Sequence, residues 1–481
     1  FEYDPDFVRQ GIEPSPLMMP VREGRVYSFG ELDKTTFKGL PGMLADSLPD
    51  TYGRALFEKW LALTGRTSSN AIETLCFLGK RCMGALEFEP AIDAVDTDIR
   101  IEVDSLVDVA REALADKSSF NVNIGSDKQA AISEILRLGT SAGGQRAKAI
   151  IAYNKATGEI RSGQVEAPDG FDYYIIKLDG VSATAGFRET ENFGRLEYSF
   201  SRLVKECGID MAECSLIEEN GRAHFLTKRF DRINGAKVHM QTLCGIAHFD
   251  YRLLRVYSYE QAFAVMRGLR LTYKEAQEMF RRMVFNILAN NTDDHNKNFS
   301  FLMDEKGHWR LAPAYDLTYI FNIGGFLPER MHCLMMRGKL QGQTIEDALA
   351  LGKENGIKRA EGIIGEVAAA IRRFRDFAEE CEVSPRWTGA VETTLNHHLS
   401  EWGLAERRKA TTIRTGGTLF EDIRVEKTYK GNYHLLCKVE GRERKYVITS
   451  KKEEYALIDK VGVDRLTDEQ LRSLVETFFL S

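Results

Sequence analysis

The sequence predicts an α+β protein with two successive lobes, the first rich in strands and the second mainly helical. Two observations lead to this prediction. Between about residues 130 and 230, short apolar strands alternate with turns that contain Gly and Asn. In the second half, apolar side chains recur at helical spacing, most clearly over 273–289 and again through much of 344–402. Residues 406–481 return to a strand-rich pattern and end in a predicted helix at 467–479.

The first half begins with turn and cap residues that precede two predicted helices. Pro and Gly at 41–42 and Pro and Asp at 49–50 are followed by helical periodicity over 51–63 and then over about 101–117. A Gly-rich turn then joins the first two strands. The expected order is strands at 132–138, 149–153 and 173–177, a helix at 192–206, and a hairpin that turns at Asn220-Gly221.

A polar loop follows the helix predicted over 273–289. Residues 291–298 read Asn-Thr-Asp-Asp-His-Asn-Lys-Asn. Apolar residues then alternate as a strand, residues 304–307 form a turn, and 308–311 return towards Asp316. This order of helix, loop, hairpin and single Asp is the layout of a kinase-like catalytic centre.

The spacing of the polar residues in this loop predicts phosphoryl transfer from ATP. Asp293 and Asn298 are separated as D-x4-N, and Asp316 follows eighteen residues after Asn298. In such a centre one carboxylate orients the hydroxyl that is phosphorylated, while an Asn and a second Asp hold Mg²⁺ against the phosphates. We therefore expect Asp293 as the base and Asn298 with Asp316 as metal ligands.

Two neighbours compete with Asp293 for the role of base. Asp294 is a second carboxylate, and His295 is expected to orient the loop rather than to abstract a proton. The loop also permits a simpler interpretation, as a solvated polar turn or an irregular calcium site. It lacks the alternating acids, central Gly and final Glu of an EF-hand.

Two features upstream complete the predicted nucleotide site. The Gly-rich turn at 139–144 offers backbone N–H groups to phosphate oxygens, although three glycines in a turn are a weak signal alone and no Walker A sequence follows. Lys177 ends an apolar strand, where it either points to solvent or binds the α- and β-phosphates. Glu197 is the expected ion-pair partner of Lys177, with Glu189 and Glu191 as competitors.

Composition excludes few classes of protein. The chain of 481 residues is 43% hydrophobic, which is enough for well-packed cores, and its formal net charge of −6 demands neither nucleic acid nor membrane. No apolar run reaches the length of a membrane span. Eight cysteines without a C-x-x-C pair predict reduced, buried thiols and a cytoplasmic protein. Because the sequence starts with Phe1, we expect the numbering to begin inside the natural protein.

Two other clusters are interpreted as structural. Met331, Met335 and Met336 with Cys333 are typical of apolar filler rather than of a soft-metal site. The basic run 372–375 is interpreted as a solvated helix face, with nucleic-acid contact as the alternative.

At these motifs the chain resembles the HipA family of bacterial toxin kinases from type II toxin–antitoxin systems. The resemblance spans roughly residues 1–385, and its motifs are specific in combination. The matching segments are LPGMLADSLPD at 40–50, LRLGTSAGGQRAKA at 136–149, Ile176-Lys177, TKRFDR at 227–232, 291–298 and PAYDLT at 313–318.

The resemblance implies a two-lobed fold of the lipid-kinase-like branch of protein kinases, with ATP and Mg²⁺ as cofactors and a protein Ser or Thr as acceptor. It implies four parts: an N-terminal subdomain at 1–120, a kinase N-lobe at 121–230, a helical C-lobe at 231–405, and an extension at 406–481 whose role the resemblance does not cover. In the best-known members the substrate is an aminoacyl-tRNA synthetase. We expect ATP contacts from the loop, the lysine and the hinge, that is from Thr140, Ser141, Ala142, Gly143, Gly144, Lys177, Lys228, Arg229 and Phe230.

The resemblance also implies regulation. A small helix-turn-helix antitoxin would bind the protein and connect it to operator DNA. Autophosphorylation in the Gly-rich loop would fall on Thr140 or Ser141, and Thr140 departs from the Ser that the family usually has. Two other functions stay open: a catalytically weak co-repressor that acts with its antitoxin, and a nucleotidyl transferase or nuclease that uses the same metal site.

Overall fold

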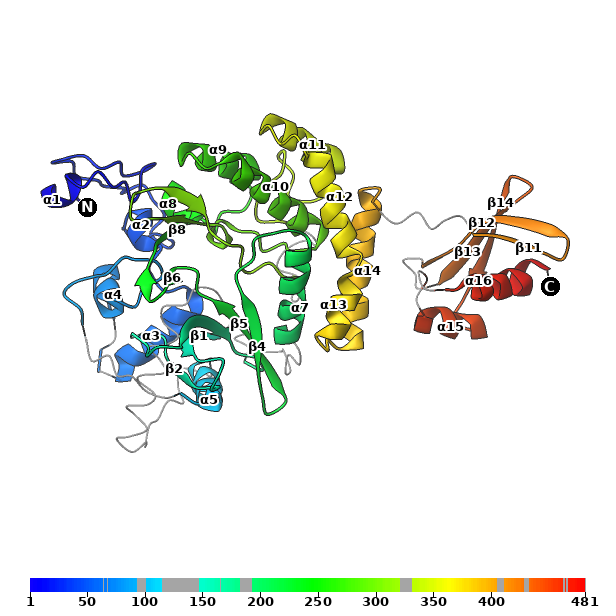
Figure 1. Ribbon diagram of the computed structural model, residues 1–481, viewed down its shortest axis with the longest axis horizontal. Coiled ribbons are helices and arrows are strands. Elements are labelled where there is room, and N and C mark those ends of the chain that lie inside the picture. Colours follow the sequence, from blue (N-terminus) through cyan, green and yellow to red (C-terminus); the bar gives the residue numbers. More distant parts are fainter. Residues whose placement is uncertain are drawn as a thin grey trace. The chain divides into compact units, whose positions relative to one another are not determined.

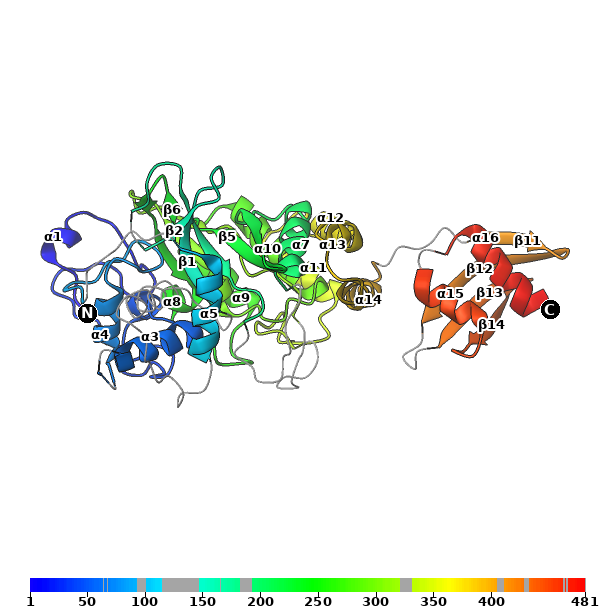
Figure 2. The ribbon, with the colours of Figure 1, turned by 90° about the horizontal axis from the view of Figure 1, so that it is seen from below.

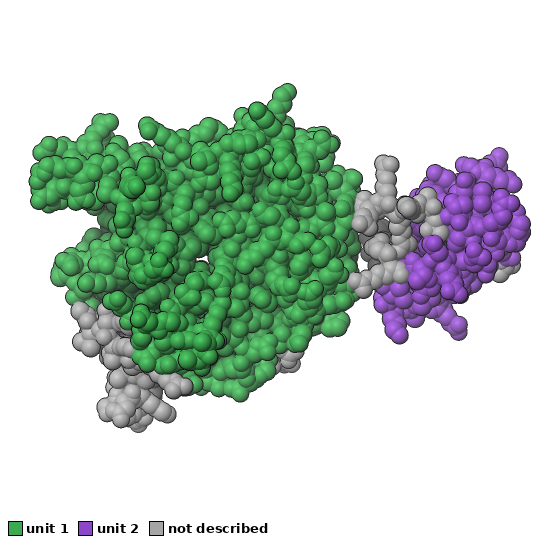
Figure 3. All heavy atoms as spheres, viewed as in Figure 1, with its two compact units in different colours: residues 1–404 green, residues 405–481 purple. Residues whose placement is uncertain are grey.

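The structure, a computed structural model, describes the chain in twelve segments. These are residues 1–63, 65–66, 68–92, 101–114, 147–164, 166–181, 193–320, 331–404, 411–427, 432–461, 463 and 466–480. The chain divides into two compact units, residues 1–404 and residues 405–481, coloured green and purple in Figure 3. Within the described segments, no helix is both long enough and apolar enough to cross a membrane. The finer divisions at 120 and 230 stay predictions.

The N-terminal part of the first unit is built from short helices. They are α1 (Pro5–Val8), α2 (Gly42–Ala45), α3 (Thr51–Leu63), α4 (Ala71–Leu78) and α5 (Val103–Leu114). The helices predicted over 51–63 and 101–117 are confirmed as α3 and α5. Aromatic rings of α3 and α4 pack together, with the centroids of Trp60 and Phe77 4.3 Å apart. Burial of such rings is the main contribution to the stability of this cluster.

A five-stranded antiparallel sheet follows, in the order β2-β1-β3-β5-β4. Figure 1 labels β1, β2, β4 and β5 of this sheet. Its strands are β1 (Lys148–Tyr153), β2 (Ile160–Ser162), β3 (Asp172–Lys177), β4 (Cys214–Glu219) and β5 (Arg222–Lys228). The predicted strands at 149–153 and 173–177 and the hairpin at Asn220-Gly221 are confirmed, while the strand predicted at 132–138 lies outside the described residues. In this sheet Lys148 pairs with Lys177, and Lys177 pairs with Phe225.

Helix α7 (Phe193–Glu206) lies against this sheet at unusually short range. A Cβ atom on Gly194 would come 1.8 Å from the carbonyl oxygen of Ala223 in β5, so only glycine allows this approach. The apolar side of α7 enters the core of the helical lobe through Leu196, Phe200 and Leu203. The contact at Gly194 therefore fixes the position of the helix that carries Glu197.

The second lobe of this unit is helical, with two small pieces of β-structure. Its helices are α8 (Leu243–Ala247), α9 (Tyr259–Gly268), α10 (Tyr273–Leu288), the 3₁₀ turn η1 (Asn296–Asn298), α11 (Ile345–Glu354), α12 (Ala360–Ile371), α13 (Phe374–Glu380) and α14 (Pro385–Glu401). Its strands are β6 (Arg232–Ile233), β7 (Ala236–Lys237), β8 (His239–Thr242), β9 (Ser300–Met303) and β10 (Trp309–Leu311). The order β10-β9-β8 confirms the predicted hairpin after the polar loop. The stripe of α10 is buried as predicted, and Figure 2 shows this helix among its neighbours.

The second unit has a sheet and a core of its own. Strands β11 (Thr411–Thr415), β12 (Thr418–Lys427), β13 (Tyr433–Val439) and β14 (Arg442–Ile448) form an antiparallel sheet in sequence order. Helices α15 (Glu453–Val461) and α16 (Asp468–Val475), with the π-helical turn η3 (Glu476–Leu480), pack on one face. The strand-rich pattern and the final helix are confirmed, whereas α15 was not predicted.

The eight cysteines are all free, as predicted. Burial raises the pKa of five of them to about 11 or above, which keeps these thiols protonated at neutral pH. The methionine cluster is apolar filler, because Met331 and Met336 are buried. In the basic run, Phe374 is buried while Arg373 is exposed, so only part of the run forms the solvated face predicted for it.

Candidate active site

Lys177, Glu197 and Asp316 meet in one ion-pair cluster. Lys177 ends β3, Glu197 lies on α7, and Asp316 lies in the chain after β10. The Lys177 ammonium pairs with the Glu197 carboxylate and lies 2.7 Å from Asp316 Oδ1. The side chain of Lys177 is only 12% exposed and that of Glu197 only 4%, so solvent screens this cluster weakly. The structure therefore brings the predicted lysine and its predicted partner together, next to a predicted metal ligand.

Asp316 is held as an anion in an uncommon backbone conformation. Its φ of 53° lies in the left-handed region, which a non-glycine residue adopts only when its surroundings require it. Desolvation alone would raise the pKa of its carboxyl, but Lys177 and Lys148 outweigh this effect and hold the pKa well below its usual range. A carboxylate that stays ionised and partly exposed is suited to bind a cation.

Asp293 is the second carboxylate that faces this site. Its side chain is 56% accessible, yet desolvation by the surrounding protein raises its pKa, and nearby Asp316 and Asp294 raise it further. His295 and Lys177 act in the opposite direction. A carboxyl with a raised pKa is a stronger base once it is deprotonated, as general-base catalysis requires. His295 Nε2 lies 3.8 Å from Asp293 Oδ1, which agrees with the expected orienting role.

Asn298 closes the loop. It ends η1, and its side-chain amide donates a hydrogen bond to the backbone carbonyl of Asp293 at 2.7 Å. Because the nitrogen of the amide is engaged, its oxygen is oriented away from that bond. This one contact fixes the spacing between the predicted base and the predicted metal ligand.

The neighbouring Asp294 has a different role from Asp293, one that the sequence did not reveal. It is fully buried and accepts hydrogen bonds from the Tyr259 hydroxyl at 2.6 Å and from the backbone N–H of Cys333 at 2.7 Å. His332 Nδ1 lies 3.1 Å from its second oxygen. Both carboxylate oxygens of Asp294 are therefore occupied by buried hydrogen bonds. Asp294 anchors the loop and does not compete as the base.

Tyr315 links the two predicted metal ligands. Its hydroxyl donates to the carbonyl oxygen of Lys297 at 2.7 Å and also bonds to the Ser300 hydroxyl. Tyr315 directly precedes Asp316, and Lys297 directly precedes Asn298. This buried contact was also missed from sequence, because a tyrosine beside a functional Asp has no spacing signal of its own.

Lys297 joins the loop to the N-terminal helices. Its ammonium lies 2.5 Å from Asp50 Oδ1 and 4.9 Å from the centre of the Tyr251 ring. Desolvation lowers the pKa of Lys297, but Asp50 and Asp46 outweigh it and raise the pKa above its usual value. The segment at 46–50 that precedes α3 is therefore part of the wall that supports the loop.

The predicted hinge residues point in different directions. Arg229 makes a bidentate, buried ion pair with Asp231, at 2.9 and 2.7 Å, so its guanidinium is used for structure. Lys228 pairs with Asp172 at 2.7 Å near the surface. The ring of Phe230 lies 5.7 Å from that of Tyr315, beside Asp316. Phe230 thus contacts the residue that directly precedes Asp316, and the ATP contacts of all three hinge residues stay predictions.

Five other predicted residues, Thr140, Ser141, Ala142, Gly143 and Gly144, lie outside the described residues. The same is true of Glu189 and Glu191, the competitors for the partner of Lys177. The strand that follows the Gly-rich segment is described, and its Lys148 is buried next to Asp316 and Lys177. Desolvation lowers the pKa of Lys148, although Asp316 acts to raise it.

The donor set fits a magnesium ion that is held jointly with phosphates. Mg²⁺ prefers oxygen ligands and is commonly bound by one or two carboxylates together with substrate phosphates and water. Asp316 and Asn298 would supply a carboxylate and an amide oxygen. Among the described residues, no three His, Cys, Asp or Glu side chains gather as a closed metal site.

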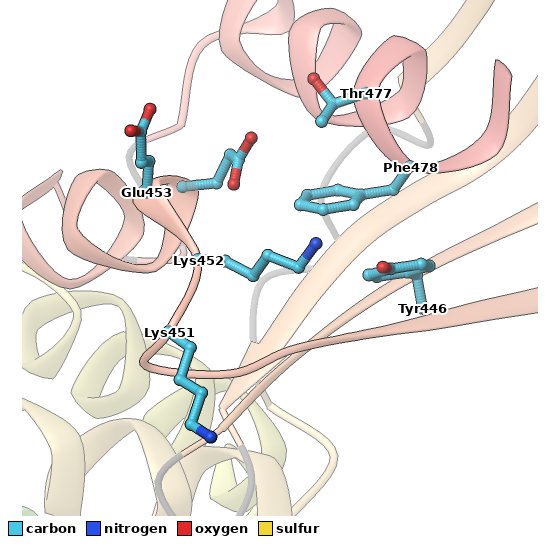
Figure 4. Close-up of a pocket in the computed structure, with 7 residues that line it drawn as sticks. Tyr446, Lys451, Lys452, Glu453, Thr477 and Phe478 are labelled. Atoms are coloured by element: carbon cyan, nitrogen blue, oxygen red, sulfur yellow. The ribbon is translucent and has the colours of Figure 1, made fainter. Parts of the chain in front are cut away.

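A separate pocket lies in the second unit (Figure 4). The ring of Tyr446 stacks on Phe478 with centroids 4.4 Å apart, and Lys452 points towards Phe478 with its ammonium 5.9 Å from the ring centre. Two glutamates, at 453 and 454, line the same pocket and offset its two lysines. None of the predicted site residues lies here.

The fold and the site define a kinase-like protein: an antiparallel sheet with a Lys–Glu ion pair to a helix, a helical lobe, and a polar loop that carries the predicted base and a predicted metal ligand. The HipA N-terminal domain matches residues 1–89, and the HipA-like C-terminal domain matches residues 140–374. The chain belongs to the HipA family.

Known proteins agree with this assignment. HipA of Shewanella oneidensis MR-1, solved as a toxin–antitoxin complex with HipB and operator DNA, superimposes with a TM-score of 0.58 at 16% identity, over 84% of this chain and 92% of that one. At this identity the likeness shows the fold.

Curated relatives also match by sequence, among them the following two. The "Putative kinase" of Haemophilus influenzae is 30% identical over 138 residues, and "Putative kinase Y4mE" of Sinorhizobium fredii is 25% identical over 190 residues. The matches cover 26% and 36% of this chain. The chain spans only 40% and 44% of the length of these relatives.

Proposed function

We propose that this chain is an ATP-dependent serine/threonine protein kinase that acts as the toxin of a toxin–antitoxin system. The observation that carries the proposal is the ion-pair cluster of Lys177, Glu197 and Asp316. It accompanies a polar loop in which the Asn298 side chain donates a hydrogen bond to the Asp293 carbonyl. These groups can perform the three tasks that phosphoryl transfer requires: binding phosphates, binding Mg²⁺ and orienting a hydroxyl.

Each group has a distinct task in the proposed reaction. Lys177 holds the α- and β-phosphates, and Glu197 keeps its ammonium in place. Mg²⁺, bound by Asp316 and Asn298, would neutralise charge on the phosphates. Asp293 orients the acceptor hydroxyl and takes its proton, and His295 keeps that carboxylate aligned. Phe230 would contact the adenine ring.

The proposed partners follow from the family. The Shewanella protein was solved with HipB and operator DNA, which supports a small helix-turn-helix antitoxin for this chain and DNA contact through that antitoxin. The acceptor would be a cytoplasmic protein, with a translation component such as an aminoacyl-tRNA synthetase as the first candidate. Autophosphorylation at Thr140 or Ser141 would regulate the site.

The test is mass measurement after incubation with Mg-ATP. The parent and an Asp293→Asn control are incubated, their intact masses are recorded, and modified peptides are mapped. A gain of about 80 Da in the parent alone, located at Thr140 or Ser141, supports a kinase. A gain of the size of AMP would instead indicate nucleotidyl transfer. No gain in initially unphosphorylated protein, together with no transfer to any added protein, would overturn the proposal.

A further inference from the structure

A short exposed loop stands beside the predicted base. It joins α8 to α9, and its tip, residues 252–256, reads Arg-Leu-Leu-Arg-Val. All five residues are exposed, and Leu253, Leu254 and Val256 are 48%, 37% and 46% accessible. Three aliphatic side chains next to one another in water cost free energy unless something covers them.

The base of this loop is firmly held. The backbone N–H of Asp250 donates to the Tyr257 hydroxyl at 2.9 Å, and the ring of Tyr257 stacks on Phe249 with centroids 4.5 Å apart. The Thr36 hydroxyl donates to the Asp250 carboxylate at 2.6 Å. A loop anchored at both ends presents its exposed side chains in a fixed position, which reduces the entropy lost when a partner binds.

The loop is connected directly to the polar loop of the candidate active site. The ring of Tyr251 lies 5.5 Å from the ring of His295. The Lys297 ammonium lies over the face of the Tyr251 ring. His295 in turn lies beside Asp293. The five exposed residues, 252–256, therefore directly follow Tyr251, whose ring contacts the polar loop.

Positive charge surrounds the aliphatic residues. Arg252 precedes them and Arg255 lies between Leu254 and Val256, and the hydrogen bond from Thr36 to Asp250 brings the segment with exposed Lys38 close to the loop. Desolvation lowers the pKa of Lys38, and the positive charges of Arg54 and Arg252 lower it further. These three cations therefore lie near one another. Three carboxylates are also present: Asp250 at the base of the loop accepts from Thr36, Glu58 pairs with Arg54 at 3.7 Å, and Asp33 faces Lys38 and Arg252. The cations outnumber them.

We propose that residues 252–256, with Lys38 and Arg54, form a docking surface for the protein that receives the phosphoryl group. The proposal rests on the kinase function above and adds the chemistry of the acceptor: an acidic segment with apolar side chains. Carboxylates of that segment would complement the cations, and its apolar side chains would cover Leu253, Leu254 and Val256. Duplex DNA fits less well, because a phosphate backbone offers nothing to cover three aliphatic side chains.

Binding of fluorescent peptides to the full chain tests this surface. One probe alternates Glu and Leu around a single Ser, and a second has Lys in place of Glu. We expect the acidic peptide to bind the parent and the basic one not to bind. Leu253→Asp with Leu254→Asp, and Lys38→Glu with Arg252→Glu, should each weaken binding about tenfold or more.

Matched controls change the same chemistry elsewhere. Ile72→Asp removes another exposed aliphatic side chain, and Lys274→Glu with Lys306→Glu reverses two other exposed cations. Both should bind the acidic peptide as the parent does, and thermal melting confirms that all variants are folded. Equal binding by the docking variants and the parent, no binding of the acidic peptide, or stronger binding of a short DNA duplex would each overturn the proposal.

Phosphate transfer to the bound peptide separates this proposal from the kinase function. Asp293→Asn should bind the peptide like the parent and leave it unmodified. The docking variants are the two double variants at Leu253 and Leu254 and at Lys38 and Arg252. If they phosphorylate the peptide with the same KM as the parent, the kinase function is supported and the docking surface is contradicted. If the docking variants lose binding while the parent modifies neither itself, the peptide nor any added protein, residues 252–256 form a peptide-binding surface and the kinase function is contradicted.

Discussion

Lys177 Nζ lies 2.7 Å from Asp316 Oδ1 while it also pairs with Glu197, so one ammonium joins the sheet, helix α7 and the chain after β10. This lysine has two anionic partners. Entry of phosphates would exchange one anionic partner for another, which preserves the charge balance of a weakly screened site.

Loss of this ammonium should slow phosphate transfer without unfolding the chain. We expect Lys177→Met to lower the rate of phosphate transfer by about 10²–10³, the usual cost of one electrostatic contact to the transition state. Lys155→Met is the matched control, because that lysine makes a surface ion pair with Glu213. Radiolabelled phosphate transfer and thermal melting are the measurements. A parent-like rate in Lys177→Met would contradict the role given to this residue.

Substitution of Asp293 should lower the rate of phosphate transfer, whereas substitution of the adjacent Asp294 should lower the free energy of unfolding. Asp293→Asn should keep its free energy of unfolding and lose about 10²–10⁴ in rate, as expected for a base. Asp294→Asn places an amide N–H next to the buried Tyr259 hydroxyl and the Cys333 backbone N–H, which both donate to the native carboxylate. We expect this substitution to lower the free energy of unfolding by about 2 kcal/mol or more. Urea denaturation and transfer assays distinguish the two. Equal stabilities for both variants would remove the anchoring role of Asp294.

Acid should stop catalysis before it unfolds the site. The pKa of Asp293 is raised, so this base becomes protonated, and inactive, at a higher pH than an ordinary Asp. The pKa of Asp316 is lowered, so its stabilising contribution is present above the unfolded pKa and is lost only as the pH falls through the folded value. We expect kcat/KM to fall on the acid side while circular dichroism stays native. An acid limb that coincides with unfolding would contradict this order.

Much of the site could be predicted because its chemistry depends on spacing along the chain. Asp293, Asn298 and Asp316 follow one another in the order that a kinase uses, and strand periodicity placed Lys177 at the end of β3. The partner Glu197 followed from the helix after that strand. Such signals are local, and the structure brings Lys177, Glu197 and Asp316 together.

The supporting contacts could not be predicted, because they join residues far apart in sequence. Asp293 and Asp294 are identical in type, and only the distant Tyr259 and Cys333 show which one is buried. The same holds for Lys297, whose partner Asp50 is 247 residues away. Helix α15 was missed since it has only nine residues and, of these, only Ile458 is buried, so its apolar pattern is weak.

Tyr315 should matter through its hydroxyl alone. Tyr315→Phe removes the bond to the Lys297 carbonyl, and we expect about 1–3 kcal/mol less stability together with a KM for Mg-ATP raised about tenfold, because Asp316 and Asn298 lose their link. Tyr319→Phe is the control, since that hydroxyl bonds to Thr394 in the helical lobe. Steady-state kinetics at varied Mg-ATP provides the measurement. A change in stability with an unchanged KM would reduce Tyr315 to a structural residue.

The two compact units should unfold separately. Residues 405–481 have a sheet, two helices and a buried core that includes Phe420, Leu435 and Leu474. An independent core is the condition for an independent cooperative transition. We expect two transitions in calorimetry of the full chain, and one of them alone in a chain that ends at Leu404. Because every predicted site residue lies before Leu404, the shortened chain should also keep its rate of phosphate transfer. A single transition in the full chain that disappears on truncation would show that the first unit needs the second in order to fold.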